Sequence, residues 1–161
     1  MGKKIQNFKN LKKVRLSLKK QGKKVVFTNG CFDLLHSGHV YLFREARKLG
    51  DALIVAVNDD ASVQKIKGPR RPIFPLRERL EILEAIQSID YLIPFSQETP
   101  REIISSLLPD VLVKGGDWNM DEVVGREEVT AAGGKVILIP PRKGQSTSQI
   151  LSRVIESFKK K

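Results

Sequence analysis

Residues 25–39 read VVFTNGCFDLLHSGH, and this stretch decides the fold. Val25–Thr28 begins it with apolar side chains that predict a buried strand, and a helical pattern follows over 38–49 until Gly50 ends it. A buried strand that runs directly into a helix is the first half of a strand–helix–strand unit. The two histidines of the chain, His36 and His39, lie in the turn between them.

The same alternation continues along the chain. Further buried strands are predicted at 53–57, 91–93, 111–113 and 136–139, and further helices at 76–87, 100–108 and 145–158. Residues 58–75 are polar and contain three prolines and a glycine, which predicts a long loop. The pattern is typical of an α/β protein with a single Rossmann-like, doubly wound, parallel five-stranded sheet. We expect its ligand site at the carboxyl ends of the strands, where the strand order reverses.

The basic charge of the chain is concentrated at its two ends. The 161 residues carry a formal charge of +11, and residues 1–24 hold ten lysines and arginines and no acidic residue. Residues 25–155 are nearly neutral. We therefore expect a Lys-rich N-terminal helix within 1–22, one domain over 23–155 and a basic tail over 156–161. A solubilising role for these ends is favoured over contact with nucleic acid or an anionic surface.

The N-terminal helix is predicted over 7–20. Its apolar stripe should dock on the domain or on a partner subunit; it comprises Phe8, Leu11, Val14 and Leu18.

Several protein classes are excluded by simple patterns. A single cysteine, Cys31, rules out a disulfide framework. No signal peptide is recognisable, and apolar runs such as 52–57 are too short to span a bilayer, so we expect a cytoplasmic protein without a membrane segment. Neither G-x-G-x-x-G nor G-x-x-x-x-G-K-[ST] occurs, which argues against a standard dinucleotide site and a P-loop.

The turn that holds the histidines suits a phosphate. Gly38 lets a ligand approach the backbone, and the start of a helix presents free N–H groups and the positive end of its dipole. Two imidazoles there can donate hydrogen bonds to phosphates that gain charge during a reaction. The alternative for His36 and His39 is a helix cap with two solvated side chains.

Thr28–His39 resembles the H-x-G-H nucleotidyltransferase superfamily, and over roughly 22–155 the chain is similar to the adenylyltransferases of bacterial ADP-heptose synthesis. The resemblance is carried by Asn29–His39, Lys48–Asp51, Val55–Asn58, Lys67–Gly68, Arg71–Pro72, Leu108–Asp110, Val113–Asp117 and Ser146–Thr147. It implies transfer of the adenylyl group of ATP to a heptose 1-phosphate for lipopolysaccharide core synthesis. Mg²⁺ is then expected as the companion of ATP, and a separate sugar kinase as the source of the sugar phosphate.

The resemblance also implies roles for individual residues. Catalytic roles fall to His36, His39 and Lys67, and binding of the sugar phosphate to Asp33, Arg71 and Lys114. Nucleotide binding falls to Thr28, Asn29, Gly30, Cys31, Phe32, Gly38, Arg79, Gly116, Asp117, Trp118, Ser146, Thr147 and Ser148. No metal ligand can be assigned from the sequence. The basic segment 64–75 is expected to be a lid that closes over the triphosphate.

Two other functions stay open at this point. The first is a related nucleotidyltransferase that uses CTP and acts on glycerol phosphate or an aminoalcohol phosphate, because the motifs do not identify the base. The second, less favoured, is a non-catalytic nucleic-acid binder that uses the Lys-rich ends. The sequence leaves the oligomeric state open, with a homo-oligomer among the alternatives.

Overall fold

The computed structural model describes residues 4–116, 118–141 and 147–159. Strands and helices alternate along it, as the sequence predicts. The elements are α1 (Phe8–Lys20), β1 (Val25–Gly30), α2 (Ser37–Arg47), β2 (Ala52–Asn58), α3 (Asp60–Lys67), α4 (Leu76–Glu84), β3 (Tyr91–Phe95), α5 (Arg101–Leu107), β4 (Val111–Gly115), η1 (Met120–Glu122), α6 (Arg126–Ala131), β5 (Lys135–Ile139) and α7 (Thr147–Lys159).

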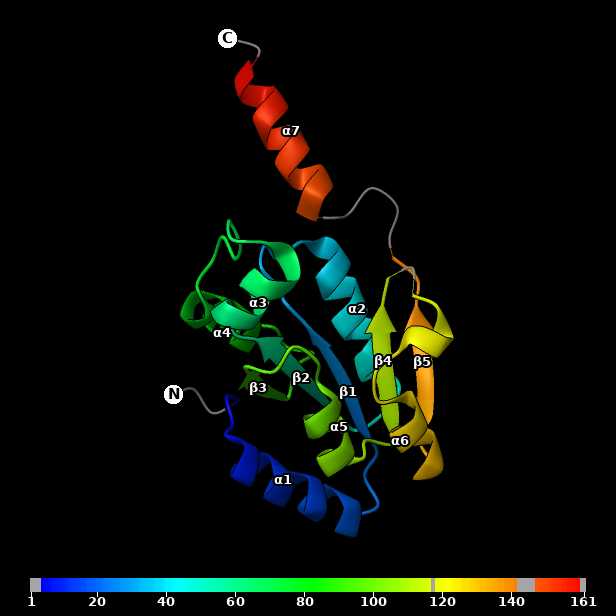
Figure 1. Cartoon of the computed structure of the whole chain (residues 1–161). Helices are drawn as coiled ribbons and strands as arrows, with labels where there is room; N and C mark the ends of the chain where they lie inside the picture. Colours follow the sequence, from blue (N-terminus) through cyan, green and yellow to red (C-terminus); the bar gives the residue numbers. More distant parts are fainter. Residues whose placement is uncertain (1–3, 117, 142–146, 160–161) are drawn as a thin grey trace.

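The five strands form one parallel sheet in the order β3-β2-β1-β4-β5. The chain adds strands in one direction from β1 to β3 and then crosses back to β4, so the order reverses between β1 and β4. Helices cover both faces of the sheet, and α7 extends away from it (Figure 1). The predicted fold class, a doubly wound five-stranded parallel sheet, is confirmed.

The core has two halves, one on each face of the sheet. Successive side chains of β2 point to opposite faces, so Ile54 packs into one half and Val55 into the other. The first half contains apolar side chains of α1, α5 and α6, and the second contains those of α2 and α4. All seven residues of β2 are buried, which explains why this strand is a continuous apolar run in the sequence.

The N-terminal segment is part of the packed domain. Leu11 of α1 is fully buried, and Leu18 nearly so, which confirms that the apolar stripe docks on the domain. Arg15 is buried beside them and donates to the carbonyl oxygens of Leu107 and Leu108. Residues 4–6 pair with the outer edge of β3. In the part of the chain that the structure describes, no helix is both long and apolar enough to cross a bilayer.

One expectation about local structure was wrong. Residues 60–67, predicted as part of a long loop, form α3. Asp59 caps this helix by accepting a hydrogen bond from the Ser62 N–H at 2.8 Å, and Val63 is fully buried under it. A cap and one buried side chain thus outweigh the polar composition. The last helix, predicted over 145–158, is α7 and continues to Lys159.

Candidate active site

A crevice of about 660 Å³ opens at the carboxyl ends of the strands, beside the point where the strand order reverses. Residues from most of the elements that end at this edge contribute to it. Its walls are Asn29, Gly30, Cys31, Phe32, Asp33, His39, Leu42, Asn58, Ile66, Lys67, Arg71, Glu98, Thr99, Pro100, Lys114, Gly115, Trp118, Glu122, Val124 and Thr147. The site therefore lies where the sheet topology places it.

Lys114 and Asn29 join the two strands that flank the crevice. Lys114 Nζ donates to Asn29 Oδ1 at 3.1 Å, and the same ammonium lies 4.8 Å from the centre of the Trp118 ring. Burial lowers the pKa of Lys114 from its ordinary value. Lys114 therefore lies in the wall of the crevice beside Trp118, whose side chain is 45% exposed.

Glycines keep the backbone of β4 close to its neighbours. A Cβ atom on Gly115 would lie 2.8 Å from the terminal carbons of Leu42. Gly116 has a φ of +118°, a conformation that side-chain-bearing residues rarely adopt. The strand can therefore pass tightly over Leu42 of α2, and the chain can turn toward Trp118.

The two histidines form a stacked pair at the start of α2. His36 is the N-cap residue, and its Nδ1 accepts a hydrogen bond from the Gly38 N–H at 3.1 Å. The backbone N–H of His36 lies 3.4 Å from Nδ1 of His39, and the ring centres are 3.9 Å apart. Since Nδ1 of each ring is an acceptor, the neutral rings carry their proton on Nε2.

His39 is the member of the pair that lines the crevice. Burial, with a smaller contribution from the charge of His36, lowers the pKa of His39 to about 4. Burial also lowers the pKa of His36. At neutral pH His39 is a neutral imidazole whose Nε2–H can donate to an anion. The helix-cap interpretation holds for His36, which caps α2 and stacks on the ring that faces the crevice.

Cys31 lies in the wall of the crevice beside this pair. Burial raises the pKa of its thiol, and this outweighs the opposing effect of Lys67 and Arg79. The group is therefore a protonated thiol at neutral pH, which makes it a poor nucleophile.

Asp33 has a different set of partners from the expected ones. The sequence suggested that it orients the sugar phosphate, but both of its carboxylate oxygens are engaged by the loop before α4. Oδ2 pairs with Arg71 Nη1 at 2.7 Å, and Oδ1 accepts from the backbone N–H groups of Ile73 and Phe74 at 2.7 and 3.0 Å. Asp33 therefore anchors this loop, and Arg71 reaches the crevice as one half of an ion pair.

Arg79 is not placed to contact a nucleotide directly. Its side chain has no exposed surface, because it lies under the loops that form the crevice. It donates to the carbonyl oxygens of Cys31, Asn58 and Phe74 at 2.5, 2.8 and 3.0 Å and pairs with Asp60 at 2.7 Å. One guanidinium thus ties together the ends of β1 and β2, the start of α3 and the loop before α4.

The predicted lid is only partly a loop. Lys67 is the last residue of α3, is exposed and lines the crevice; Gly68 then ends the helix with a φ of +94°. This segment holds four cations, Lys65, Lys67, Arg70 and Arg71, and two of them are paired: Lys65 with Glu98 at 3.6 Å and Arg71 with Asp33. Movement of this segment is therefore expected around Gly68 rather than over the whole of 64–75.

The other predicted residues fall into four groups. Asn29, Gly30, Phe32, Trp118 and Thr147 line the crevice, whereas Thr28 is buried beneath it with its hydroxyl unpartnered among the described atoms. Gly38 and Gly116 lie at its edges, in the first turn of α2 and directly after β4. Asp117 and Ser146 lie outside the described residues, as does the side chain of Ser148.

Asn58 and residues 98–100 were not predicted as part of the site. Asn58 ends β2, is buried and donates to Ser62 Oγ at 2.8 Å, and residues 98–100 follow β3. The histidines were predicted as site residues because ligands bind at the carboxyl ends of parallel strands, and Asn58 and residues 98–100 also lie at such strand ends. A search of every strand end would have found them.

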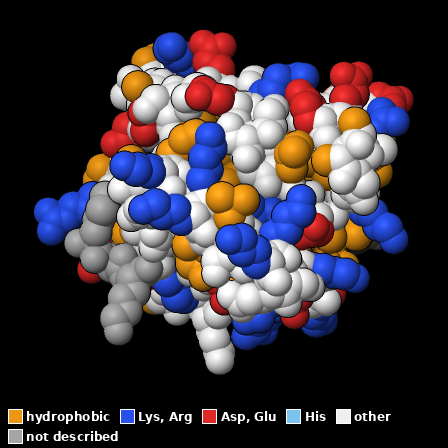
Figure 2. Space-filling model, turned by 90° about the horizontal axis from the view of Figure 1, so that it is seen from below, with side chains coloured by type: hydrophobic (Ala, Val, Ile, Leu, Met, Phe, Trp, Pro, Cys, Tyr) orange, Lys and Arg blue, Asp and Glu red, His pale blue; other side chains and the backbone are white. Residues whose placement is uncertain are grey.

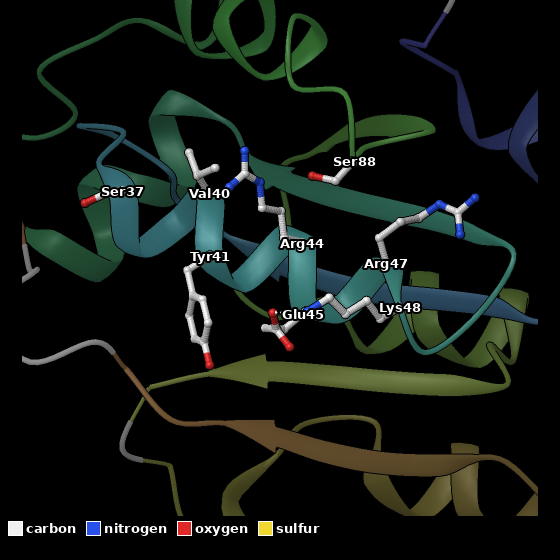
Figure 3. Close-up of a pocket in the computed structure, with 8 residues that line it drawn as sticks. All are labelled: Ser37, Val40, Tyr41, Arg44, Glu45, Arg47, Lys48 and Ser88. Carbon is white, nitrogen blue, oxygen red and sulfur yellow. Dashed lines mark hydrogen bonds and ion pairs between the residues drawn. The ribbon is translucent and has the colours of Figure 1, made fainter.

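A second groove, of about 710 Å³, lies on the outer side of α2 and shares no lining residue with the crevice. Arg44 and Tyr41 leave α2 on opposite sides there (Figure 3). Lys48 pairs with Glu45 at 2.6 Å, and Arg47 with Asp90 at 2.9 Å. Protein carboxylates therefore already neutralise two of its three cations, and the crevice is the better phosphate site.

Comparison with known proteins agrees with this geometry. The cytidylyltransferase-like family matches residues 27–153. "Bifunctional protein HldE" of Pectobacterium carotovorum is 47% identical over 150 residues, which is 93% of this chain and 31% of that protein. The protein of the same name from Nitrosococcus oceani is 53% identical over 131 residues, 81% of this chain and 28% of that protein. The chain thus spans about a third of the length of these curated relatives.

A solved structure shares both the fold and part of the sequence. The lipopolysaccharide core biosynthesis protein from Thermoplasma volcanium matches with a TM-score of 0.62 and 29% identity, over 77% of this chain and all of that one. The family match covers β1 to α7, including the histidine turn and every wall of the crevice. The chain therefore belongs to the cytidylyltransferase-like family of nucleotidyltransferases.

Proposed function

We propose that this protein transfers the adenylyl group of ATP to a heptose 1-phosphate and releases ADP-heptose and pyrophosphate. The observation that carries the proposal is His39: a neutral imidazole at the start of α2, in the switch-point crevice, with Nε2 as its available donor. The relatives named HldE and the lipopolysaccharide protein from Thermoplasma volcanium support a nucleotide sugar as the product.

The reaction requires no nucleophile from the protein. A phosphate oxygen of the sugar attacks the α-phosphorus of ATP and forms a new P–O bond. The bond from the α-phosphorus to the oxygen that bridges to the β-phosphorus breaks, and pyrophosphate leaves with the electron pair. Negative charge grows on the transferred and leaving phosphates, so catalysis consists of positioning and charge stabilisation.

In this proposal, different residues of the crevice stabilise the charge and position the nucleotide. His39 donates from Nε2, and the free N–H groups of the first turn of α2 lie beside it. Lys67 at the end of α3 and Lys114 at the end of β4 bring positive charge from two sides. Trp118 offers a flat apolar surface for a nucleobase. Cys31 stays protonated and takes no part in the bond changes.

Mg²⁺ is proposed as the companion of ATP. The described residues contain no group of three or more His, Cys, Asp or Glu arranged to hold a metal. Phosphate oxygens and water would therefore supply most of its ligands, and it would neutralise charge on the leaving pyrophosphate. In this proposal the site acts in the cytoplasm, and a sugar kinase supplies the 1-phosphate.

The experiment that tests the proposal is a matrix of nucleotides and phosphates read by pyrophosphate release. ATP, CTP, GTP and UTP are each paired with heptose 1-phosphate, a hexose 1-phosphate, glycerol 3-phosphate and phosphocholine. We expect release with ATP and heptose 1-phosphate at a rate well above every other pair. Release with CTP and glycerol phosphate or phosphocholine instead would overturn the substrate assignment in favour of the cytidylyltransferase alternative.

His39→Asn tests the mechanism in the same assay. It keeps a polar side chain but loses the Nε2–H donor, and we expect turnover to fall by about 10²-fold or more. Lys135→Gln, an exposed residue at the amino end of β5, is the matched control and should not change the rate. A folded His39→Asn enzyme with normal turnover contradicts the mechanism but leaves the substrate assignment intact.

A further inference from the structure

The outer face of α1 and the turn after it form a basic surface at the end of the molecule opposite the crevice. Seven lysines on it are exposed, and none of them has a carboxylate partner among the described residues: Lys9, Lys12, Lys13, Lys19, Lys20, Lys23 and Lys24. Figure 2 shows this end of the molecule, with Lys and Arg side chains spread over it and the acidic ones mostly toward the rim.

The orientation of this surface is fixed by packing. Leu11 and Leu18 are buried in the core, and Arg15 is held by Leu107, Leu108 and Asp110. The apolar stripe of α1 is therefore already occupied by the protein's own domain. Lys9, Lys13 and Lys20 are therefore held on the opposite side of the helix, and Lys12 lies at its flank over the Phe8 ring.

A single large apolar side chain stands in the middle of these lysines. Leu16 is 60% exposed although it belongs to a helix whose other leucines are buried. Lys9, Lys12 and Lys13 lie seven, four and three residues before Leu16, and Lys20 lies four residues after it. This spacing places the four lysines around Leu16 on one helix face. A single exposed leucine is common on protein surfaces, but a leucine surrounded by lysines forms a small amphipathic patch.

We propose that this face of α1 docks on the surface of an anionic lipid bilayer. Lysines attract acidic headgroups over about a Debye length, and Leu16 can enter the apolar boundary that a bilayer offers beneath them. A nucleic acid could pair its phosphates with the lysines, but it offers no apolar surface for Leu16. The described part of this face also carries no aromatic side chain free for base stacking. The contact is peripheral and reversible, since one leucine cannot anchor the protein.

Docking in this orientation leaves the enzyme site free. α1 leads directly into the amino end of β1, whereas the crevice opens at the carboxyl ends of the strands (Figure 1). A protein bound through α1 therefore presents its crevice to the solution. The inference does not depend on which nucleotide or sugar the crevice takes.

The test is co-sedimentation of the full chain with lipid vesicles. One set contains phosphatidylcholine alone, and the other contains about one-third phosphatidylglycerol at low salt, about 0.05 M. We expect binding to the anionic vesicles only, and its loss at about 0.3 M salt. The triple variant Lys9→Gln, Lys13→Gln, Lys20→Gln should lower the partition coefficient about 100-fold, on the order of five-fold for each lysine.

Two matched variants separate this proposal from general basicity. The control triple variant carries Arg77→Gln, Arg153→Gln and Lys159→Gln, at exposed positions on α4 and α7. It removes the same charge and should keep vesicle binding within about two-fold. Leu16→Ser should weaken vesicle binding several-fold and leave retention on heparin or DNA unchanged. All three proteins should keep their melting temperature, because the changed side chains are exposed.

The outcomes that overturn the proposal are distinct. Equal losses in the two triple variants would mean that net charge alone drives binding. Tight DNA binding that is insensitive to Leu16→Ser, with weak vesicle binding, would assign the face to nucleic acid. A dimer in solution that Leu16→Ser dissociates would assign it to a second copy, and no binding to any of these would leave a solvated face.

Discussion

Lys114 Nζ lies 3.1 Å from Oδ1 of Asn29, and this hydrogen bond joins two residues that are 85 positions apart in the sequence. It connects the carboxyl ends of β4 and β1, the two strands between which the sheet order reverses. Without a ligand, Asn29 gives the half-buried ammonium its polar partner. When a phosphate enters the crevice, the same ammonium can turn to it over a short distance.

Lys114 should therefore act on the bound nucleotide or sugar phosphate rather than on stability. We expect Lys114→Met to lower kcat/KM by about 10- to 100-fold, because one charge-assisted hydrogen bond to phosphate is lost. Unfolding in urea should change little, since the flexible methionine fills the same space. The matched control is Lys135→Met, an exposed lysine at the amino end of β5. An unchanged kcat/KM in folded Lys114→Met would remove this residue from the site.

The lowered pKa of His39 makes stability depend on pH. The folded protein holds this ring neutral down to a pKa of about 4, whereas the unfolded chain binds the proton near the ordinary value of 6.5. Protonation therefore favours the unfolded chain, and stability falls as the pH drops from 6.5 toward 4. Between about pH 7 and pH 5 we expect His39 to account for a loss of roughly 2 kcal/mol.

Urea unfolding at both pH values measures this loss. His39→Asn cannot bind the proton, so its stability should fall by about 2 kcal/mol less than that of the original protein over the same interval. Other titrating groups contribute equally to both proteins, which makes the difference specific to position 39. Parallel losses in the two proteins would show that His39 is not held neutral by the fold.

Arg79 should be a positioning residue whose loss destabilises the protein. Arg79→Met removes the guanidinium that three backbone carbonyls and Asp60 share, and leaves those buried acceptors without a donor. We expect the free energy of unfolding to fall by roughly 3 kcal/mol or more. Arg77→Met on the exposed side of the same helix is the matched control and should stay within about 0.5 kcal/mol. Similar stabilities for the two variants would contradict the assignment.

Asp33 should hold the loop before α4 closed. Asp33→Ala removes the acceptor of Ile73 and Phe74 and the ion-pair partner of Arg71. Hydrogen exchange at these two backbone amides should then accelerate by at least about ten-fold, while exchange in β1 stays slow. Glu98→Ala, which frees Lys65 on the other side of the crevice, is the control and should leave these amides protected. Unchanged protection in Asp33→Ala would mean that other contacts hold the loop.

Much of the fold could be predicted from local pattern alone. The apolar runs that open β1 and fill most of β2 indicate strands buried on both faces, because a strand with one face in water would alternate apolar and polar residues. His36 and His39 could be placed at the site because strand ends and helix starts meet there in any sheet of this class. Periodicity likewise predicted that the stripe of α1 is buried.

The roles of single charged residues depended on tertiary structure. Asp33 and Arg79 looked like ligand-binding residues, yet all but one of the partners that engage them lie 19 to 48 positions away, which no local pattern specifies. α3 was missed because its stability comes from the burial of Val63 and the cap of Asp59. Periodicity indicates which side of a helix or strand is buried. A hydrogen bond between distant residues depends instead on which strands become neighbours. For β1 and β4, the crossover decides this only when the sheet assembles.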